Sequence, residues 1–145
     1  PFLTKTNTCL TKAGSERSRI LESGTLLLAN SGATLGVPKI LKIRSCANDG
    51  VAAFLDLSEQ VNQMFLYYYL NFLTPIFRET IAPGMGQPNL NTELISMTPL
   101  PLPPLVEQRE IAEIMDSFDR KIAEEIRLLE QLSESKTALS QKLFT

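Results

Sequence analysis

Residues 105–145 read LVEQREIAEIMDSFDRKIAEEIRLLEQLSESKTALSQKLFT and contain neither glycine nor proline. Apolar side chains recur there every three or four residues, with a mean step of about 3.6, which is the period of an α-helix. A single helix is therefore predicted to begin near Pro104, because proline suits the first helical position and Glu107 suits the first turn. Its apolar stripe, in which Lys136 is the one non-apolar position, consists of Ile111, Ile114, Phe118, Ile122, Ile126, Leu129, Leu132, Leu139 and Leu143.

The predicted helix is too long to be covered by the rest of the chain. At ~1.5 Å per residue it measures about 60 Å, whereas a domain of ~100 residues has a radius of gyration near ~13 Å. Soluble monomers rarely expose an apolar surface of this extent, so the stripe needs a partner helix. We therefore predict a coiled-coil spacer or dimerisation segment over residues 105–145. Its partner is either a second helical repeat or the antiparallel helix of a second copy in a homodimer.

The segment before this helix reads PLPLPP over residues 99–104 and cannot be helical. We interpret it as a proline-rich linker that follows a globular part over residues 1–98. The length and the apolar content, 43% of 145 residues, are those of one ordinary globular domain with an appendage. The predicted fold class is α+β, with one long coiled-coil α-helix after the globular part.

Two strands joined by a turn are predicted in the first third of the chain. Thr25–Ala29 is a short apolar run with turn residues on both sides, and Val37–Ile43 alternates between apolar and polar residues with one slip. The connection Ser31–Gly36 contains two glycines and is typical of a hairpin-like turn.

A buried helix is predicted to follow, because apolar residues at helical spacing begin at Val61 and continue to Phe72. Asp56 with Glu59 forms a possible capping box for this helix, and Ser58 is a competing cap. Pro75 is expected to end or kink it. Three consecutive tyrosines, residues 67–69, could stack on bases, but packing in the core explains them more simply.

Basic residues are concentrated near the N-terminus. Seven bases and two acids lie between Pro1 and Cys46, whereas nine acids and six bases lie between Glu107 and the end. This asymmetry indicates two surfaces with different partners. We predict a DNA-binding surface made of the seven bases and of polar residues in the loops Ser31–Gly36 and Gly84–Asn91. Its members are Lys5, Lys12, Arg17, Arg19, Ser31, Thr34, Lys39, Lys42, Arg44, Gln87, Asn89 and Asn91.

The sequence contains no pattern typical of catalysis, metal binding or nucleotide-phosphate binding. The chain has no histidine and no phosphate-binding loop with its lysine, and Cys9 and Cys46 lack metal-ligand spacing. Glu134 and Lys136 superficially resemble the carboxylate–lysine pair of metal-dependent nucleases. They lie on the predicted helix without a second group of carboxylates around them, so a solvated helix face is the better interpretation of this pair. We expect no catalytic residue, no metal and no cofactor. No secretory signal or membrane-spanning stretch is found, and a cytoplasmic protein is expected.

The segments Gly84–Asn91 (GMGQPNLN) and Leu100–Gln108 (LPLPPLVEQ), with Ile111 after them, closely resemble a characteristic junction in type I restriction–modification specificity subunits. In that family it joins the end of a target recognition domain to the start of a helical spacer. Gly24–Leu28 followed by Ser31–Gly36 is similar to the strand and turn of the same family. The resemblance covers nearly the whole chain.

The resemblance implies sequence-specific recognition of double-stranded DNA by a non-catalytic scaffold subunit. Such subunits carry two recognition domains, each followed by a helix, and the two helices pair antiparallel to set the distance between two half-sites. Methyltransferase and restriction subunits assemble around this frame and perform the reactions. The chain starts at Pro1 without an initiator methionine, so it is expected to be a processed or truncated piece of something longer. The resemblance implies that it lacks the first part of a recognition domain. The alternative is a protein–protein interaction module that acts through its coiled coil without binding DNA.

Overall fold

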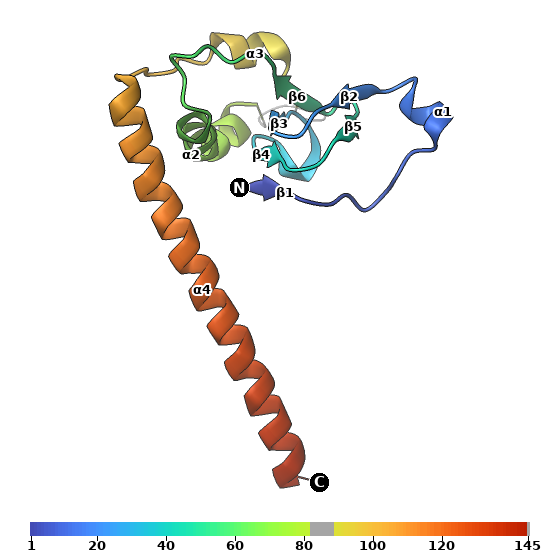
Figure 1. Ribbon diagram of the computed structural model, residues 1–145, viewed down its shortest axis with the longest axis vertical. Coiled ribbons are helices and arrows are strands. Elements are labelled where there is room, and N and C mark those ends of the chain that lie inside the picture. The colour runs from blue at the N-terminus through green and yellow to red at the C-terminus, as the bar shows by residue number, and fades with distance from the viewer. Residues whose placement is uncertain (82–88, 145) are drawn as a thin grey trace. The chain divides into compact units, whose positions relative to one another are not determined.

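The computed structural model describes residues 1–81 and 89–144 (Figure 1). Its contacts divide the chain into two compact units, Pro1–Arg109 and Glu110–Thr145. The first unit contains both strands and helices, and the last element is one long helix. The predicted α+β class with a long C-terminal helix is therefore confirmed.

The first unit is built on a four-stranded sheet with the strand order β1-β4-β3-β6. β1 lies parallel to β4, whereas β3 runs antiparallel to both β4 and β6. A separate ribbon pairs β2 with β5, and a short helix α1 precedes it. The bounds of these elements are β1 Phe2–Leu3, α1 Lys12–Ser15, β2 Arg19–Leu21, β3 Leu26–Ala29, β4 Pro38–Leu41, β5 Ser45–Ala47 and β6 Val51–Phe54.

Both predicted strands are confirmed with shorter bounds, as β3 and β4. Their antiparallel pairing places Leu26 opposite Ile40 and Leu28 opposite Pro38. Leu26, Leu28 and Ile40 belong to the main core, whereas Leu27 lies in a second, smaller cluster on the other side of the strand. This alternation follows from the two-residue period of a strand, and it means that both faces of the sheet are covered.

Helix α2, Gln63–Ile81, covers one face of this sheet. The buried side chains that it contributes to the main core are Leu66, Tyr67, Tyr68, Leu70, Leu73 and Phe77. The prediction that the tyrosine run belongs to the core is confirmed for Tyr67 and Tyr68, each 6% exposed. The face of α2 that carries Phe72 and Ile76 is exposed, so the helix is less completely buried than its composition predicted.

The predicted caps of α2 are wrong. The side-chain oxygen of Asn62 accepts a hydrogen bond from the Phe65 N–H at 2.9 Å, which makes Asn62 the N-cap. Asp56 lies at a bend with φ 51°, and the carbonyl oxygen of Ser58 accepts the Val61 N–H in a turn. Several residues before the helix have side chains that can act as caps. Which of them is the N-cap depends on where the backbone enters the first helical turn.

Pro75 does not end α2, which continues to Ile81. Proline removes the hydrogen bond to the carbonyl oxygen of Asn71, four residues earlier. Asn71 and Pro75 are both exposed, so water can reach that carbonyl. Of the two outcomes predicted for Pro75, an end of the helix is therefore excluded.

The chain next enters a short helix, α3, Thr92–Met97, and then the proline segment. Asn91 is the N-cap of α3, because its side-chain oxygen accepts the Leu94 N–H at 2.8 Å. The Tyr69 hydroxyl donates to the carbonyl oxygen of Pro99 at 2.9 Å and thereby ties the start of the proline segment to α2. Residues 99–104 form neither helix nor strand.

The last element, α4, runs without interruption from Leu105 to Phe144. The predicted helix and its unbroken course between Ile111 and Leu139 are confirmed. Its first turn belongs to the first unit, and the second unit consists of α4 alone from Glu110 onward. Within the described residues, no helix has the length and apolar character needed to cross a membrane.

Candidate nucleic-acid interface

The two polar loops that were predicted to lie near nucleic acid meet in the structure. Ser31 and Asn89 form an isolated antiparallel bridge. Beside it, the N–H of Leu90 donates to the carbonyl oxygen of Asn30 at 2.7 Å. Gln87, the other predicted contact in the second loop, lies outside the described residues.

A third loop, residues 48–50, joins them. The Asn30 N–H donates to the Gly50 carbonyl oxygen, and its side-chain amide donates to that of Asp49, both at 3.0 Å. The Gly50 N–H in turn donates to the side-chain oxygen of Asn48 at 3.1 Å. An added Cβ at Gly50 would lie 3.0 Å from the Ser31 hydroxyl oxygen, so the loops are in close contact. We call residues 30–36, 48–50 and 89–91 the loop cluster.

Two glycines shape the most exposed part of the loop cluster. Gly32 and Gly36 have φ values of 73° and 79°, which L side chains rarely adopt. Between them a 3-10 turn, η1, Gly32–Thr34, is closed by the Leu35 N–H on the Gly32 carbonyl oxygen at 3.1 Å. Residues 32–34, including the predicted DNA contact Thr34, are exposed.

Two side chains of α2 hold this loop by its carbonyl groups. The Thr74 hydroxyl donates to the carbonyl oxygen of Gly36 at 2.7 Å. One turn later, Arg78 donates from Nε to the carbonyl oxygen of Leu35 at 3.0 Å and from Nη2 to that of Ala33 at 3.2 Å. Sequence reasoning missed Arg78, because the count of basic residues stopped at Cys46 and the contact joins residues more than 40 positions apart.

Of the seven predicted bases, Arg19 lies beside the loop cluster. Its Nη2 donates to the carbonyl oxygen of Asn48 at 3.1 Å and to that of Val51. It is exposed and stands on β2, opposite Ala47 of β5. The β2–β5 ribbon thus places one guanidinium next to the third loop.

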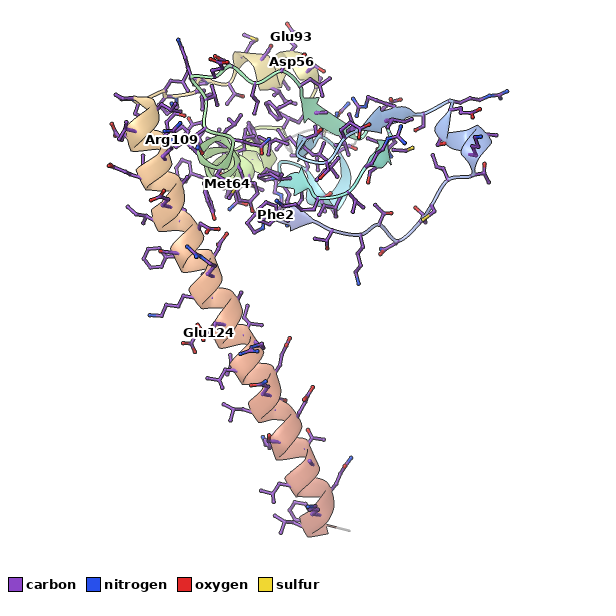
Figure 2. The ribbon with its side chains drawn as sticks, viewed as in Figure 1. Phe2, Asp56, Met64, Glu93, Arg109 and Glu124 are labelled. Atoms are coloured by element: carbon purple, nitrogen blue, oxygen red, sulfur yellow. The ribbon has the colours of Figure 1, made fainter. Side chains whose placement is uncertain are left out.

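Two other predicted bases lie at the opposite end of β4. The loop Ser31–Gly36 precedes β4, whereas Lys42 and Arg44 follow it. Arg44 forms an ion pair with Glu22 at 2.9 Å. Lys42 Nζ lies 4.2 Å from the centre of the ring of Phe2, which is labelled in Figure 2. The structure therefore does not gather all the predicted residues into one patch.

The remaining predicted residues are dispersed. Lys5, Lys12 and Arg17 are exposed on the segment between β1 and β2. Lys39 is half-buried in the middle of β4, opposite Leu27. Asn91 is exposed, and its side-chain oxygen is already used as the cap of α3.

The described residues contain no group of three or more side chains suited to a metal ion. Both cysteines are free. A hollow of about 720 Å³ lies between the N-terminal segment and the β2–β5 ribbon, with Leu21, Leu27 and Leu41 among its lining residues. A smaller cavity of about 190 Å³ in the main core has an apolar lining that includes Leu66, Tyr69 and Phe77. Neither holds a pair of groups suited to acid–base chemistry.

The second unit presents the predicted apolar stripe to solvent. Ile111 is half-buried, and the other eight members of the stripe are between 51% and 68% exposed. In Figure 2 the side chains of α4 project from all sides of the helix. The apolar members are Ile114, Phe118, Ile122, Ile126, Leu129, Leu132, Leu139 and Leu143.

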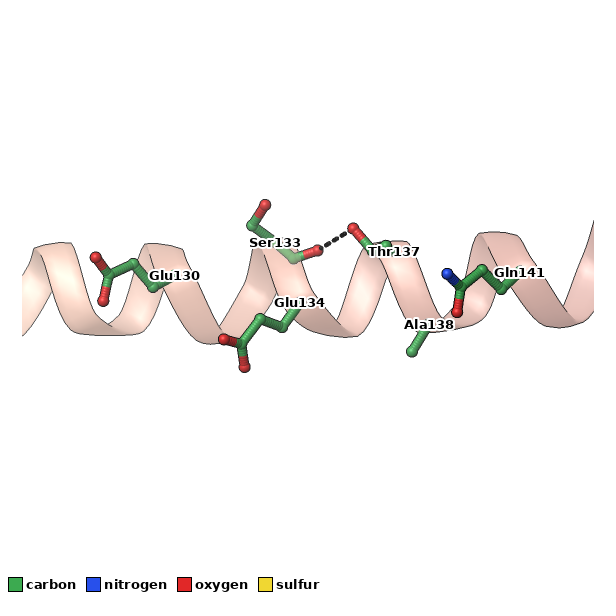
Figure 3. A pocket seen from close by; sticks show the side chains of 6 residues that line it. All are labelled: Glu130, Ser133, Glu134, Thr137, Ala138 and Gln141. Atoms are coloured by element: carbon green, nitrogen blue, oxygen red, sulfur yellow. Dashed lines mark hydrogen bonds between the residues drawn. The ribbon is translucent and has the colours of Figure 1, made fainter.

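A polar face of α4 lies roughly a third of a turn around the helix from this stripe. Figure 3 shows its side chains along the helix, where the Thr137 hydroxyl donates to the Ser133 carbonyl oxygen at 3.0 Å. One helix supplies all of its lining, so it does not enclose a ligand. We call this set the polar face; its residues are Glu130, Ser133, Glu134, Thr137, Ala138 and Gln141.

Comparison with known proteins identifies the family of this chain. The family model described as "Type I restriction modification DNA specificity domain" matches residues 4–134, which include most of both units. The chain belongs to this family. The predicted resemblance to a specificity subunit is thereby confirmed.

Two curated relatives come from Methanocaldococcus jannaschii. The type I restriction enzyme MjaVIII specificity subunit is 33% identical over 85 residues, which are 59% of this chain and 20% of that protein. The putative type I restriction enzyme MjaX specificity subunit is 27% identical over 119 residues, or 82% of this chain and 28% of that protein. Both are named specificity subunits, which agrees with the prediction of a recognition component and not a catalytic one. This chain spans less than a third of either relative.

Solved structures share the fold. The HsdS subunit from Thermoanaerobacter tengcongensis is 26% identical with a TM-score of 0.57, covering 72% of this chain and 24% of that one. The type I restriction–modification S subunit from M. genitalium is 20% identical with a TM-score of 0.63, covering 78% and 30%. The second likeness is evidence for the fold alone.

Proposed function

We propose that this chain is the greater part of one repeat of a DNA-recognition and scaffold subunit in a type I restriction–modification complex. The observation that carries the proposal is the family match over residues 4–134, which joins the globular part to most of the helix. In this proposal residues 1–98 form part of a target recognition domain, residues 99–104 a linker, and residues 105–145 a spacer. Double-stranded DNA is the ligand, and the protein works in the cytoplasm.

The loop cluster is the part of the proposed recognition surface best supported by geometry. It gathers exposed backbone and short polar side chains from three loops, of which Ser31 and Asn89 are in direct contact. Such groups suit hydrogen bonding to phosphates and base edges. Arg19 adds a positive charge beside it, and the other predicted bases supply a wider field that attracts DNA.

The long helix is proposed to pair with a second helix. Burial of a stripe residue such as Ile122 or Leu129 removes roughly 100 Å² of apolar surface from water, which contributes on the order of 2 kcal/mol before entropic costs. The partner is the helix of a second repeat or that of a second copy. In a homodimer, two identical antiparallel helices present the same stripe to each other. Methyltransferase and restriction subunits then assemble on this frame and carry out the reactions.

The alternative, a protein–protein interaction module without DNA binding, is supported by the same exposed stripe. Binding of a labelled mixed-sequence DNA duplex at low salt separates the two. A specificity subunit is expected to bind and to lose affinity steeply as salt rises, because counterions are released from the phosphates. A chain that forms helical dimers but leaves the duplex unbound at low salt would support the alternative.

A further inference from the structure

Arg78 occupies an unusual position at the loop cluster. The two donors on one edge of its guanidinium, Nε and Nη2, are used by the carbonyl oxygens of Leu35 and Ala33. The Thr74 hydroxyl, one helical turn earlier, holds the carbonyl oxygen of Gly36. The same α2 face packs Phe77 against Gly36, where an added Cβ would lie 3.3 Å from the Phe77 Cβ. The loop is thus fixed against α2 through three of its carbonyl groups and through the packing of Gly36.

The other side of this arrangement is open to solvent. Residues 32–34 are exposed, and so is Arg78. An arginine side chain has five N–H donors in a rigid plane, and the two contacts above leave the remainder available. None of the ion pairs in the described part of the chain involves Arg78, whereas Arg44 is paired with Glu22. Arg78 therefore carries an unneutralised charge directly beside the exposed turn.

We propose that Arg78 is a bifunctional residue of the DNA interface, positioning the 32–36 loop and contacting a DNA phosphate. Its inner edge fixes the loop carbonyls, and its outer edge donates to the phosphodiester oxygens of a duplex that lies across the turn. Arginine suits both tasks, because its planar fork meets a carbonyl pair on one edge and a phosphate on another. This inference rests on the proposed DNA-binding function and adds a residue that charge clustering in the sequence did not indicate.

The test measures binding of a fluorescein-labelled mixed-sequence duplex to the full chain over a series of salt concentrations. Arg78→Gln is expected to weaken binding at low salt and to reduce the salt slope by about 1, the effect of losing one phosphate contact. Arg78→Lys keeps the charge and should retain the slope. Arg127→Gln, on α4, removes the same charge from an exposed arginine outside the proposed surface and should leave the slope unchanged.

A second readout separates positioning from charge. Amide hydrogen exchange at Leu35, Gly36 and Val37 should quicken in Arg78→Gln, and also in Thr74→Val, which removes one loop contact without a change of charge. Thr74→Val should weaken DNA binding while keeping the salt slope. Equal salt slopes for Arg78→Gln and Arg127→Gln would overturn the proposed phosphate contact. Unchanged amide exchange at Leu35, Gly36 and Val37 in Arg78→Gln would overturn its positioning role. If the unmodified chain binds no duplex, the proposed function fails instead, and the exchange experiment still tests the loop contact.

Discussion

Gln108 Oε1 accepts a hydrogen bond from the backbone N–H of Asn62 at 2.8 Å, and Asn62 is the N-cap of α2. The Nε2 group of Gln108 donates to the carbonyl oxygens of Gln60 and Pro103, at 2.9 Å and 2.8 Å. The side chain is 1% exposed and therefore uses its whole amide to satisfy buried backbone groups. The first turn of α4 is thereby joined to the start of α2.

Replacing Gln108 by leucine should lower the free energy of unfolding of the first unit by about 2–4 kcal/mol. Leucine is similar in size, but it leaves one N–H and two carbonyl groups without partners, and an unsatisfied buried group costs roughly 1–3 kcal/mol. Urea unfolding followed by tyrosine fluorescence measures this loss. Gln131→Leu, at an exposed position of α4, is the matched control and should change the value by less than about 0.5 kcal/mol. Equal stability of the two variants would show that the Gln108 contacts contribute little.

Gly36→Ala should destabilise the first unit more than Gly24→Ala does. Both glycines have a positive φ, 79° and 95°, so both substitutions introduce backbone strain of roughly 1–3 kcal/mol. Only at Gly36 would the new Cβ also press on Phe77, because nothing lies within 4 Å at Gly24. Thermal unfolding should rank the two variants in this order. The reverse order would contradict the packing of the loop against α2.

Changing Lys39, Lys42 and Arg44 together to alanine should weaken binding of a mixed DNA duplex and flatten its salt dependence. The reason is the loss of positive charge from the N-terminal third of the chain. Arg44 contributes least to this loss, because Glu22 already neutralises part of its charge. Fluorescence anisotropy at several salt concentrations measures the effect. A triple variant of α4, Arg120→Ala, Lys121→Ala and Arg127→Ala, has the same charge change. An equal loss of affinity in both triple variants would show that Lys39, Lys42 and Arg44 do not form a DNA-binding surface.

Replacing Ile122 and Ile126 by aspartate should dissociate the proposed homodimer. Both side chains belong to the exposed stripe, and the change would force carboxylates into the helix–helix seam. Sedimentation equilibrium at micromolar concentration is expected to show a dimer for the unmodified chain and a monomer for the double variant. Ser133→Asp with Thr137→Asp adds the same charge on the polar face and should leave the dimer intact. A monomer of the unmodified chain at this concentration would contradict the proposed homodimer.

The parts of the fold that depend on local periodicity could be predicted from the sequence. The helical spacing of apolar residues was enough to predict α4. Apolar runs bounded by turn residues were enough to predict β3 and β4, because these patterns do not depend on contacts with distant residues. Strand β6, Val51–Phe54, was missed, since its four residues show no alternation. The cap of α2 was misassigned because Asp56, Ser58 and Asn62 all have capping side chains.

The candidate site was predictable only in part. The two glycine-containing loops were recognised, and the structure brings their residues Ser31 and Asn89 together. Charge clustering along the chain, however, grouped Arg19 with Arg44, although only Arg19 lies beside the loops. Arg78 was overlooked, because its contact with the loop depends on how α2 packs on the sheet. Spatial neighbours of this kind are set by tertiary packing and leave no periodic signal.

Selection of bound duplexes from a library with randomised sequence tests the DNA-recognition claim most directly. The full chain is incubated with the library at moderate salt, and the retained duplexes are sequenced after several rounds. We expect enrichment of one short motif, and, where the chain forms a homodimer, two inverted copies of it at a fixed spacing. Retained DNA without any enriched motif, or no retained DNA, would contradict sequence recognition by this chain.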